Sequence, residues 1–319
     1  MAFIVKNESR PDLAAGLSQK ALSGAAVFIA PLLFPAFRVA ERGGTIACAQ
    51  VVRGTAVKNR SSGVALTGTR VAPVDVTYSV NKIEGRDLLD DTDVKDAGGE
   101  DAALAAAARF AGYDAIKLYE QDAAATVFTA TRYAAAASIV ATAPFDALNK
   151  AALAVKDYGK PTLVCSETWL NNFVKISAVS TVLKDLFGHG WFKEIQDLGN
   201  VNKALGAAFG VDGVLIGDNA FWAVAGGGGT TSVEAYDYTD AAAVVALRDV
   251  GGDPRGTAKK LPTYGFAPTF LPEGGSLEEP FEVETAYLPK ERQNAVTAVL
   301  HAVAKEINSA AATLVKLPS

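Results

Sequence analysis

The chain has 319 residues, 50% of them hydrophobic and 20% charged, and a formal net charge of -5 at pH 7. A chain of this size and composition buries a substantial core and usually divides into about two domains, which excludes intrinsic disorder as its main state. The acidic balance argues against a protein whose task is to neutralise nucleic-acid phosphates. Alanine is far more frequent than usual, so much of the apolar half consists of small side chains.

The rarest residues exclude metal chemistry. Two histidines, two cysteines and one methionine are the whole supply of the side chains that most zinc, copper, haem and iron–sulfur sites require. Cys48 and Cys165 are far apart and no CxxC motif occurs, which indicates a reducing compartment or indifference to redox state. We therefore expect no metal site and no cofactor.

An apolar stretch at 21–40 carries no charge between Lys20 and Arg38. Charges of both signs precede it, unlike the start of a signal peptide, and Pro31 and Pro35 interrupt it, unlike a transmembrane helix. The sequence predicts no membrane association. It favours an extended arm whose apolar residues pack against something else.

Two β-rich runs follow, at 45–58 and 64–80, with turn residues at 59–63 between them. Runs rich in Val and Thr around such a turn predict a long β-hairpin. An isolated two-stranded hairpin is marginal in water, so we expect this one to lean on another surface. The only local basic excess of the chain lies on it, at Lys58, Arg60 and Arg70.

The acidic run at 86–101 has two interpretations. It lies just ahead of a helix N-terminus, where negative charge is favoured, and we expect a solvated loop there. A weak calcium site is the alternative. The EF-hand pattern fails, because counting from Asp91 there is no Gly at the sixth position and no Glu at the twelfth.

The segment 100–128 gives the strongest helix signal. Alanine is the best helix former, and apolar residues recur at the spacing of one helix face, at Leu104, Ala108, Ala111, Ala115 and Leu118. The polar Asp114, Lys117 and Gln121 are expected on the opposite face. At 1.5 Å per residue this helix would be about 43 Å long, which is longer than most globular helices.

The rest of the chain mixes helical and strand patterns. We expect β or loop structure at 129–143, a helix from Pro144 to about 159, a buried strand at 162–166 and a long loop at 251–280. Two further helices are expected over 167–175 and 177–188, and two strands around 217–219. The C-terminal run fits either an amphipathic helix from 289 or, as we favour, strands at 282–287, 293–304 and 310–316.

Candidate catalytic groups are isolated from one another. Cys165 and His189 lack a local signature of a thiol dyad, and Ser166 lacks the GxSxG motif and is better explained as a helix N-cap. The glycine-rich segments contain neither GxxxxGK[ST] nor GxGxxG. We predict no catalytic residue and a protein that is not an enzyme.

The order of these elements resembles a known family. An apolar arm with an LLFP motif at 32–35 leads into an extended hairpin and a long helix, followed by FDALNKA at 145–151, TLVCSETW at 162–169 and a β-rich return. This order is similar to that of the major capsid proteins of tailed bacteriophages, which have the Hong Kong ninety-seven type of capsid fold.

The resemblance implies an α+β phage major capsid fold in four parts. These are an N-terminal arm (1–40), an extended β-hairpin loop (41–80), a peripheral domain with its spine helix at 100–128 (81–140 and 281–319) and an axial domain (141–280). Candidate inter-subunit contacts are Phe28, Leu32, Leu33 and Phe34 in the arm, Lys58, Arg60 and Arg70 on the hairpin, and Gly226 and Gly229 in an axial loop. Some members cross-link Lys to Asn, but no matching motif surrounds Lys58 and Asn59.

The implied function is structural. Hexamers and pentamers would form an icosahedral phage head that encloses double-stranded DNA without sequence-specific binding, with scaffolding and portal proteins as partners. The protein would be assembled in the host cytoplasm and reside in the virion. Two alternatives stay open: the shell of an encapsulin-like nanocompartment, and a cytosolic α/β enzyme with a Ser, Cys or carboxylate mechanism.

Overall fold

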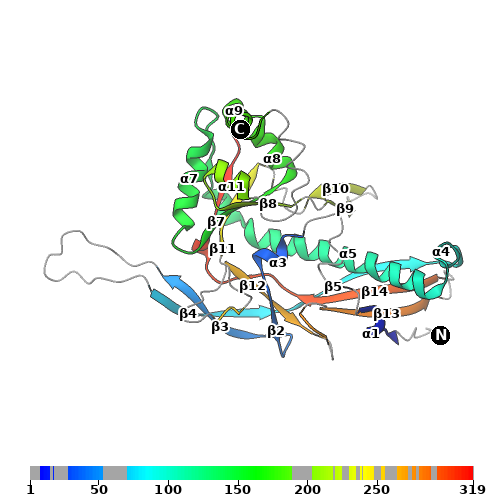
Figure 1. The fold of residues 1–319 in the computed structure, drawn as a ribbon. Helices are drawn as coiled ribbons and strands as arrows, with labels where there is room; N and C mark the ends of the chain where they lie inside the picture. The colour runs from blue at the N-terminus through cyan, green and yellow to red at the C-terminus, as the bar shows by residue number, and fades with distance from the viewer. Residues whose placement is uncertain are drawn as a thin grey trace.

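The structure is a computed structural model. It describes residues 8–14, 17, 28–52, 70–188, 203–217, 220–224, 230–234, 238, 240–247, 253–255, 264–271, 275–277, 280–288 and 293–318. In this part of the chain, two larger β-sheets each carry their own helices, and two small antiparallel pairs accompany them (Figure 1). We call the larger sheets the seven-stranded and the five-stranded sheet.

The seven-stranded sheet is built around β14 (Gln293–Ala302), which pairs along its length with β5 (Asn81–Leu89) and β13 (Phe281–Leu288). The short β1 (Glu8–Ser9) pairs with β13. At the other end β12 (Gly265–Phe270) pairs with β14, with β15 (Lys305–Glu306) and, in parallel, with β2 (Ala36–Val39). Strands from the N-terminal and the C-terminal parts of the chain therefore belong to one sheet.

Helix α5 (Glu100–Val127) lies across β5 and β14, as Figure 1 shows. A Cβ atom added to Gly85 of β5 would lie 1.9 Å from the Ala111 carbonyl oxygen, so strand and helix are in direct backbone contact. The predicted long helix is confirmed. One position of its buried stripe was wrong: Leu118 is 42% exposed, because the stripe continues from Ala115 to Tyr119 at a spacing of four.

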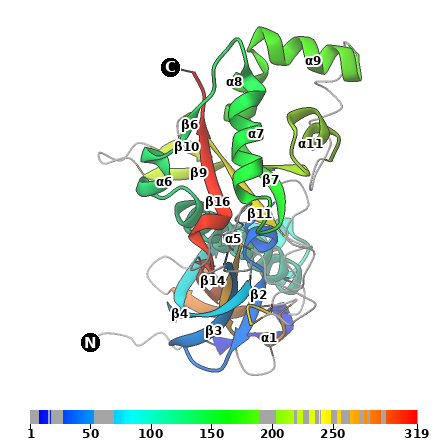
Figure 2. The same cartoon turned by 90° about the vertical axis from the view of Figure 1, so that its left-hand side faces the viewer.

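The five-stranded sheet has the order β6 (Ala137–Ser138), β16 (Ala312–Lys316), β11 (Ala241–Leu247), β7 (Lys160–Ser166) and β8 (Gly213–Gly217). Four helices accompany it, α7 (Pro144–Val155), α8 (Glu167–Val174), α9 (Ser177–Phe187) and α11 (Lys203–Phe209) (Figure 2). The predicted N-cap is confirmed, since the Ser166 hydroxyl accepts the Trp169 N–H at 2.9 Å.

Two small antiparallel pairs complete the described strands. One joins β3 (Gly43–Val52) to β4 (Arg70–Ser79), and the other joins β9 (Ala220–Val224) to β10 (Thr230–Glu234). The predicted strands on either side of 217–219 are therefore β8 and β9.

Three predicted loops contain regular structure. The acidic run comprises the end of β5 and α4 (Asp91–Asp96), whose N-cap Asp90 accepts the backbone N–H groups of Thr92 and Asp93. The run 129–143, predicted as β or loop, contains the helix α6 (Ala130–Ala134) and, as predicted, a short strand at Ala137–Ser138, and the long loop at 251–280 contains β12. The last error has a physical cause: β12 is buried at every position except its last, so its sequence lacks the alternating pattern of a half-exposed strand.

The C-terminal strands are confirmed, but they do not all belong to one sheet. β13 and β14 lie in the seven-stranded sheet, whereas β16 pairs with β11 of the five-stranded sheet. Conversely, β12 lies inside the predicted axial segment and belongs to the seven-stranded sheet. The short 3-10 helix η1 (Ser309–Ala311) marks the crossing from one sheet to the other.

Candidate functional site

The predicted hairpin is the most distinctive candidate surface. β3 and β4 keep one antiparallel register from Gly43 opposite Ser79 to Val52 opposite Arg70. The Arg70 backbone thus has a partner, while the predicted contacts Lys58 and Arg60 lie outside the described residues. Figure 1 shows the two strands leaving the body of the molecule side by side. An extended ribbon of this kind exposes most of its surface to solvent or to a neighbour.

The hairpin leans on the subunit along part of β3. Cys48, Phe266 and Ile307 form a small buried cluster of their own, separate from the main core. The Ala49 N–H donates to the Pro254 carbonyl at 2.9 Å, and Asn308 Nδ2 donates to the Val51 carbonyl at 3.1 Å. Burial raises the pKa of the Cys48 thiol to about 12. This part of the hairpin is therefore fixed to the body of the subunit. We expected such a contact, because a two-stranded hairpin alone is only marginally stable in water.

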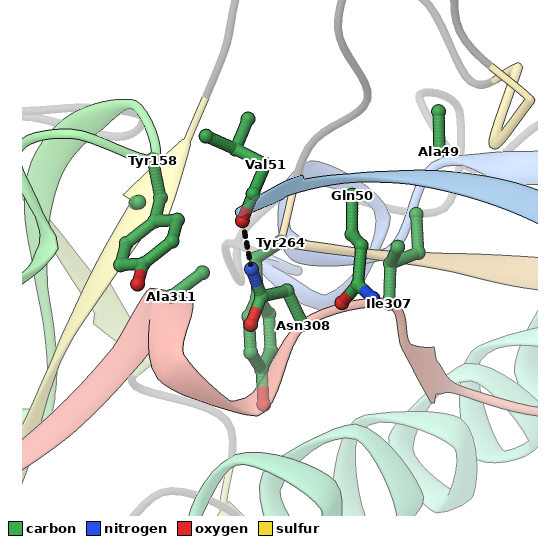
Figure 3. Close-up of a pocket in the computed structure, with 9 residues that line it drawn as sticks. Ala49, Gln50, Val51, Tyr158, Tyr264, Ile307, Asn308 and Ala311 are labelled. Carbon is green, nitrogen blue, oxygen red and sulfur yellow. Dashed lines mark hydrogen bonds between the residues drawn. The ribbon is translucent and has the colours of Figure 1, made fainter. Parts of the chain in front are cut away.

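A cavity of about 20 Å³ lies where the hairpin meets both sheets. Figure 3 shows Gln50 and Val51 of the hairpin facing Tyr264 and Asn308, with Tyr158 on the far side. A volume of this size holds about one water molecule and excludes a metabolite. The described part of the chain also contains no cluster of three His, Cys, Asp or Glu side chains that could hold a metal ion.

The apolar arm differs from its prediction. α1 (Pro11–Ala14), α3 (Ala30–Leu33) and β2 place it within the subunit, and Glu120 of α5 accepts the Ala30 N–H at 2.8 Å. Phe28, Leu33 and Phe34 are buried in the main core.

Three candidate contacts are thereby corrected to core residues of the same chain: Phe28, Leu33 and Phe34. The physical reason is that Pro31 lies in the first turn of α3 and Pro35 separates α3 from β2, and this short helix and strand turn the apolar side chains inward. Leu32, on the opposite side of α3, is 40% exposed and stays available to a neighbour.

Other candidates are separated or lie outside the described residues. The Cys165 thiol is buried in β7, 4.0 Å from the Leu215 carbonyl oxygen, while His189 is not described. Gly226 and Gly229 also lie outside the described residues, between β9 and β10 in sequence. No helix of the described segments is long and apolar enough to cross a membrane.

Large exposed apolar side chains, which the sequence patterns did not single out, occur on three helices. Phe110 of α5 is 66% exposed, Leu153 of α7 is 64% exposed, and Leu186 of α9 is 59% exposed. Phe110 lies on the face of α5 turned away from the sheet. Single exposed apolar residues are common, so each is a candidate contact and not a site in itself.

Comparison with known proteins identifies the fold. No protein-family model and no curated protein matches the sequence. A phage-related protein from Bordetella bronchiseptica RB50 superposes with a TM-score of 0.60 at 14% identity, covering 97% of this chain and 97% of that chain.

Two further solved structures cover almost the whole chain. A protein described as a candidate prophage capsid protein from E. coli CFT073 gives a TM-score of 0.53 at 10% identity, covering 98% and 100% of the two chains. A virus-like particle from Pyrococcus furiosus gives 0.50 at 12% identity, covering 96% and 97%. The chain therefore has the α+β capsid fold of the tailed-phage major capsid proteins, the Hong Kong ninety-seven type.

Proposed function

We propose that this chain is a structural protein, the major capsid subunit that assembles into the hexamers and pentamers of an icosahedral phage head. One observation carries the proposal: the likeness to a prophage capsid protein and to a virus-like particle extends over more than nine-tenths of both chains. The head would enclose double-stranded DNA by containment, which is compatible with a net charge of -5.

The contacts between subunits would come from the hairpin and from exposed apolar positions. Leu32 on α3, together with Lys58, Arg60 and Arg70 on the hairpin, are the proposed contacts to neighbouring subunits, and Gly226 and Gly229 the proposed contacts near a symmetry axis. Contacts in a closed ring are heterologous, so one surface of each subunit meets a different surface of the next. An extended ribbon can supply the first of these surfaces.

The domain assignment follows the two sheets. We propose a peripheral domain made by the seven-stranded sheet and α5, and an axial domain made by the five-stranded sheet and its helices. Compared with the expectation from sequence, β12 moves to the peripheral domain, and β6 and β16 move to the axial domain. Scaffolding and portal proteins would act as partners during assembly in the host cytoplasm, and the finished protein would reside in the virion.

Electron microscopy of the expressed chain tests this function. We expect closed particles or rings of subunits in negative stain, and a stable 33.1 kDa monomer under every condition tried would contradict the proposal. Deleting residues 1–40 is not a suitable control, because it would remove β2 and the buried Phe34.

Replacing 53–69 by a two-residue Asn-Gly turn is the better variant. It joins the directly opposed Val52 and Arg70 by the turn that such pairs favour. The shortened chain should keep its fold by circular dichroism and lose assembly. An enzyme with this fold would keep both fold and activity.

The likeness to the Pyrococcus furiosus virus-like particle favours one alternative, a nanocompartment shell that encloses an enzyme. The contents of particles purified from their natural source separate the two functions. Nuclease-protected double-stranded DNA supports the phage head, and a co-purifying enzyme supports the compartment. Genes next to this one give a second criterion: terminase and portal genes in the first case, and a ferritin-like or peroxidase gene in the second.

A further inference from the structure

The described chain passes between the two sheets three times. The first connection runs from α5 through α6 to β6, the second from β11 to β12, and the third from β15 through η1 to β16. One side chain at each connection meets the others at one point: Arg132 in the first, Tyr264 at the end of the second, directly before β12, and Glu306 at the end of β15, where the third begins.

Arg132 holds the C-terminal end of α5. Its Nη1 atom donates to the carbonyl oxygens of Thr126 at 3.0 Å and Val127 at 2.9 Å, groups that have no partner within the helix. The positive charge is also favourable there, because the helix dipole is negative at its C-terminus. The Thr129 hydroxyl caps α6 by accepting the Arg132 N–H, which sets the residue one turn beyond the end of α5.

The same guanidinium binds the other two connections. Its Nη2 atom forms an ion pair with the Glu306 carboxylate, whose Oε2 also accepts the Tyr264 hydroxyl at 2.9 Å. The guanidinium carbon lies 5.6 Å from the centre of the Tyr264 ring. The Arg132 side chain is only 10% exposed, so removing its partner leaves a largely buried charge.

The hairpin is fixed to the third connection as well. Asn308, two residues beyond Glu306, donates to the Val51 carbonyl, and Ile307 packs with Cys48 in the small cluster beneath β3. A rotation of one sheet relative to the other must therefore move Glu306 and, with it, the base of the hairpin.

We propose that Arg132, Tyr264 and Glu306 form a clamp that fixes the angle between the two sheets and the direction of the hairpin. Resting on the proposed function, the clamp would set the curvature of the assembled shell, since subunits that meet at a different angle close into a particle of different size. The three residues are positioning residues: they contact one another and no substrate.

Distance measurement between the sheets tests the clamp without requiring assembly. Spin labels on the exposed positions Ala106→Cys of α5 and Lys150→Cys of α7 report one distance across the junction, while the native thiols Cys48 and Cys165 are buried. In the unassembled subunit we expect a single narrow distance distribution. Glu306→Gln should shift and broaden this distribution, and the milder Tyr264→Phe should do so to a lesser extent.

Two controls separate a clamp from general destabilisation. Glu84→Gln makes the same chemical change in an ion pair with Lys82 that lies within β5 alone. Ser166→Ala removes a buried helix cap inside the five-stranded sheet, so it lowers stability without touching a connection. Both controls should keep the narrow distribution.

An unchanged distribution in folded Glu306→Gln and Tyr264→Phe, or equal broadening in the Ser166→Ala control, would overturn the clamp. Particle diameter gives the second measurement. Glu306→Gln should yield a wider range of diameters than the unmodified chain, and an unchanged range would refute the link to curvature. Failure of the unmodified chain to form particles would refute the proposed function instead, and leave the distance result valid.

Discussion

The two sheets bury their strands in different ways. β7 of the five-stranded sheet is buried at every position except its first, whereas β5 of the seven-stranded sheet alternates between buried and exposed positions. A continuous buried run indicates cover on both faces, and an alternating one indicates cover on a single face. β7 is thus covered on both faces, whereas β5, at its place in the seven-stranded sheet, has one open face.

Charged side chains take the place of a second layer on that open face. Glu84 and Glu282 stand opposite Val299 on either side, and Arg86 and Glu284 do the same for Thr297. Val299 is fully buried between these charged neighbours. Long charged side chains on the flanking strands β5 and β13 therefore help to shield the small side chains of β14. The comparison teaches that neighbouring strands can supply part of the cover that helices supply elsewhere.

Gly85→Ala should have the largest effect, because it acts on the contact between β5 and the long helix α5, which packs on the seven-stranded sheet. Its new Cβ would lie 1.9 Å from the Ala111 carbonyl oxygen and 2.8 Å from the Ala115 nitrogen, so helix and strand must separate. We expect a loss of about 3 kcal/mol or more in the free energy of unfolding, measured by urea titration. Gly43→Ala is the control, since its nearest neighbour would be 3.7 Å away. Equal losses would show that α5 is not seated on Gly85.

Gly206→Ala tests the same kind of contact in the five-stranded sheet and should cost less. The new Cβ would lie 2.6 Å from the Gly213 backbone, but α11 is short and β8 is an edge strand, so both can shift. Alanine also gains about 1 kcal/mol of helix propensity over glycine. We expect a net loss of about 1–2 kcal/mol.

Ala207→Gly on the exposed side of α11 isolates the propensity term. It should lower stability by about 1 kcal/mol. If Gly206→Ala lowered the free energy of unfolding as much as Gly85→Ala does, the contact of α11 with β8 would be no easier to adjust than that of α5 with β5.

His301→Gln should have the smallest effect and should show it only in the pH dependence. Burial lowers the pKa of His301 on the open face of the seven-stranded sheet, and the positive charges of Arg42 and Lys82 lower it further, against the opposing effect of Glu84 and Glu284. Below about pH 6.5 the unfolded chain binds a proton that the folded chain does not, so stability falls until the lower folded pKa is reached.

The measurement is the urea midpoint at about pH 7.5 and about pH 5.5, on either side of the ordinary histidine value. The unmodified chain should lose stability at the lower pH, and His301→Gln should lose less. An identical loss in both chains would show that His301 is not the buried group that titrates.

Elements with strong local patterns were predictable from the sequence. The alanine-rich α5 and the amphipathic α7 each carry their period within one segment, whereas the C-terminal run fitted both a helix and strands before the structure decided for strands. Elements that depend on partners far away in the sequence were not predictable in this way. The strand β12 owes its place to β2 and β14, which come from opposite ends of the chain, and β11 lies between β7 and β16.

The candidate contacts divide in the same way. Local composition marked the hairpin, and pairing between β3 and β4 agrees with it. Local composition also marked the arm, but hydrophobicity alone does not tell whether the same chain or a neighbour covers a segment, and Phe34 proved to be core. Arg132, Tyr264 and Glu306 had no local signal at all, since Arg132 is more than a hundred residues from the other two, and three whole strands separate Tyr264 from Glu306 in sequence.

The buried thiol of Cys48 beneath the hairpin can report whether the hairpin is attached to the body of the subunit. Cys48 is 2% exposed, and its raised pKa keeps it protonated at neutral pH, so a thiol reagent has neither access to it nor a thiolate to attack. Detaching β3 from Phe266 and Ile307 would give the reagent access to Cys48 and would lower the pKa of its thiol again. The rate at which Cys48 is alkylated therefore measures how often the hairpin leaves the body of the subunit, and comparing free subunits with assembled ones would give the strength with which a neighbour holds it in place.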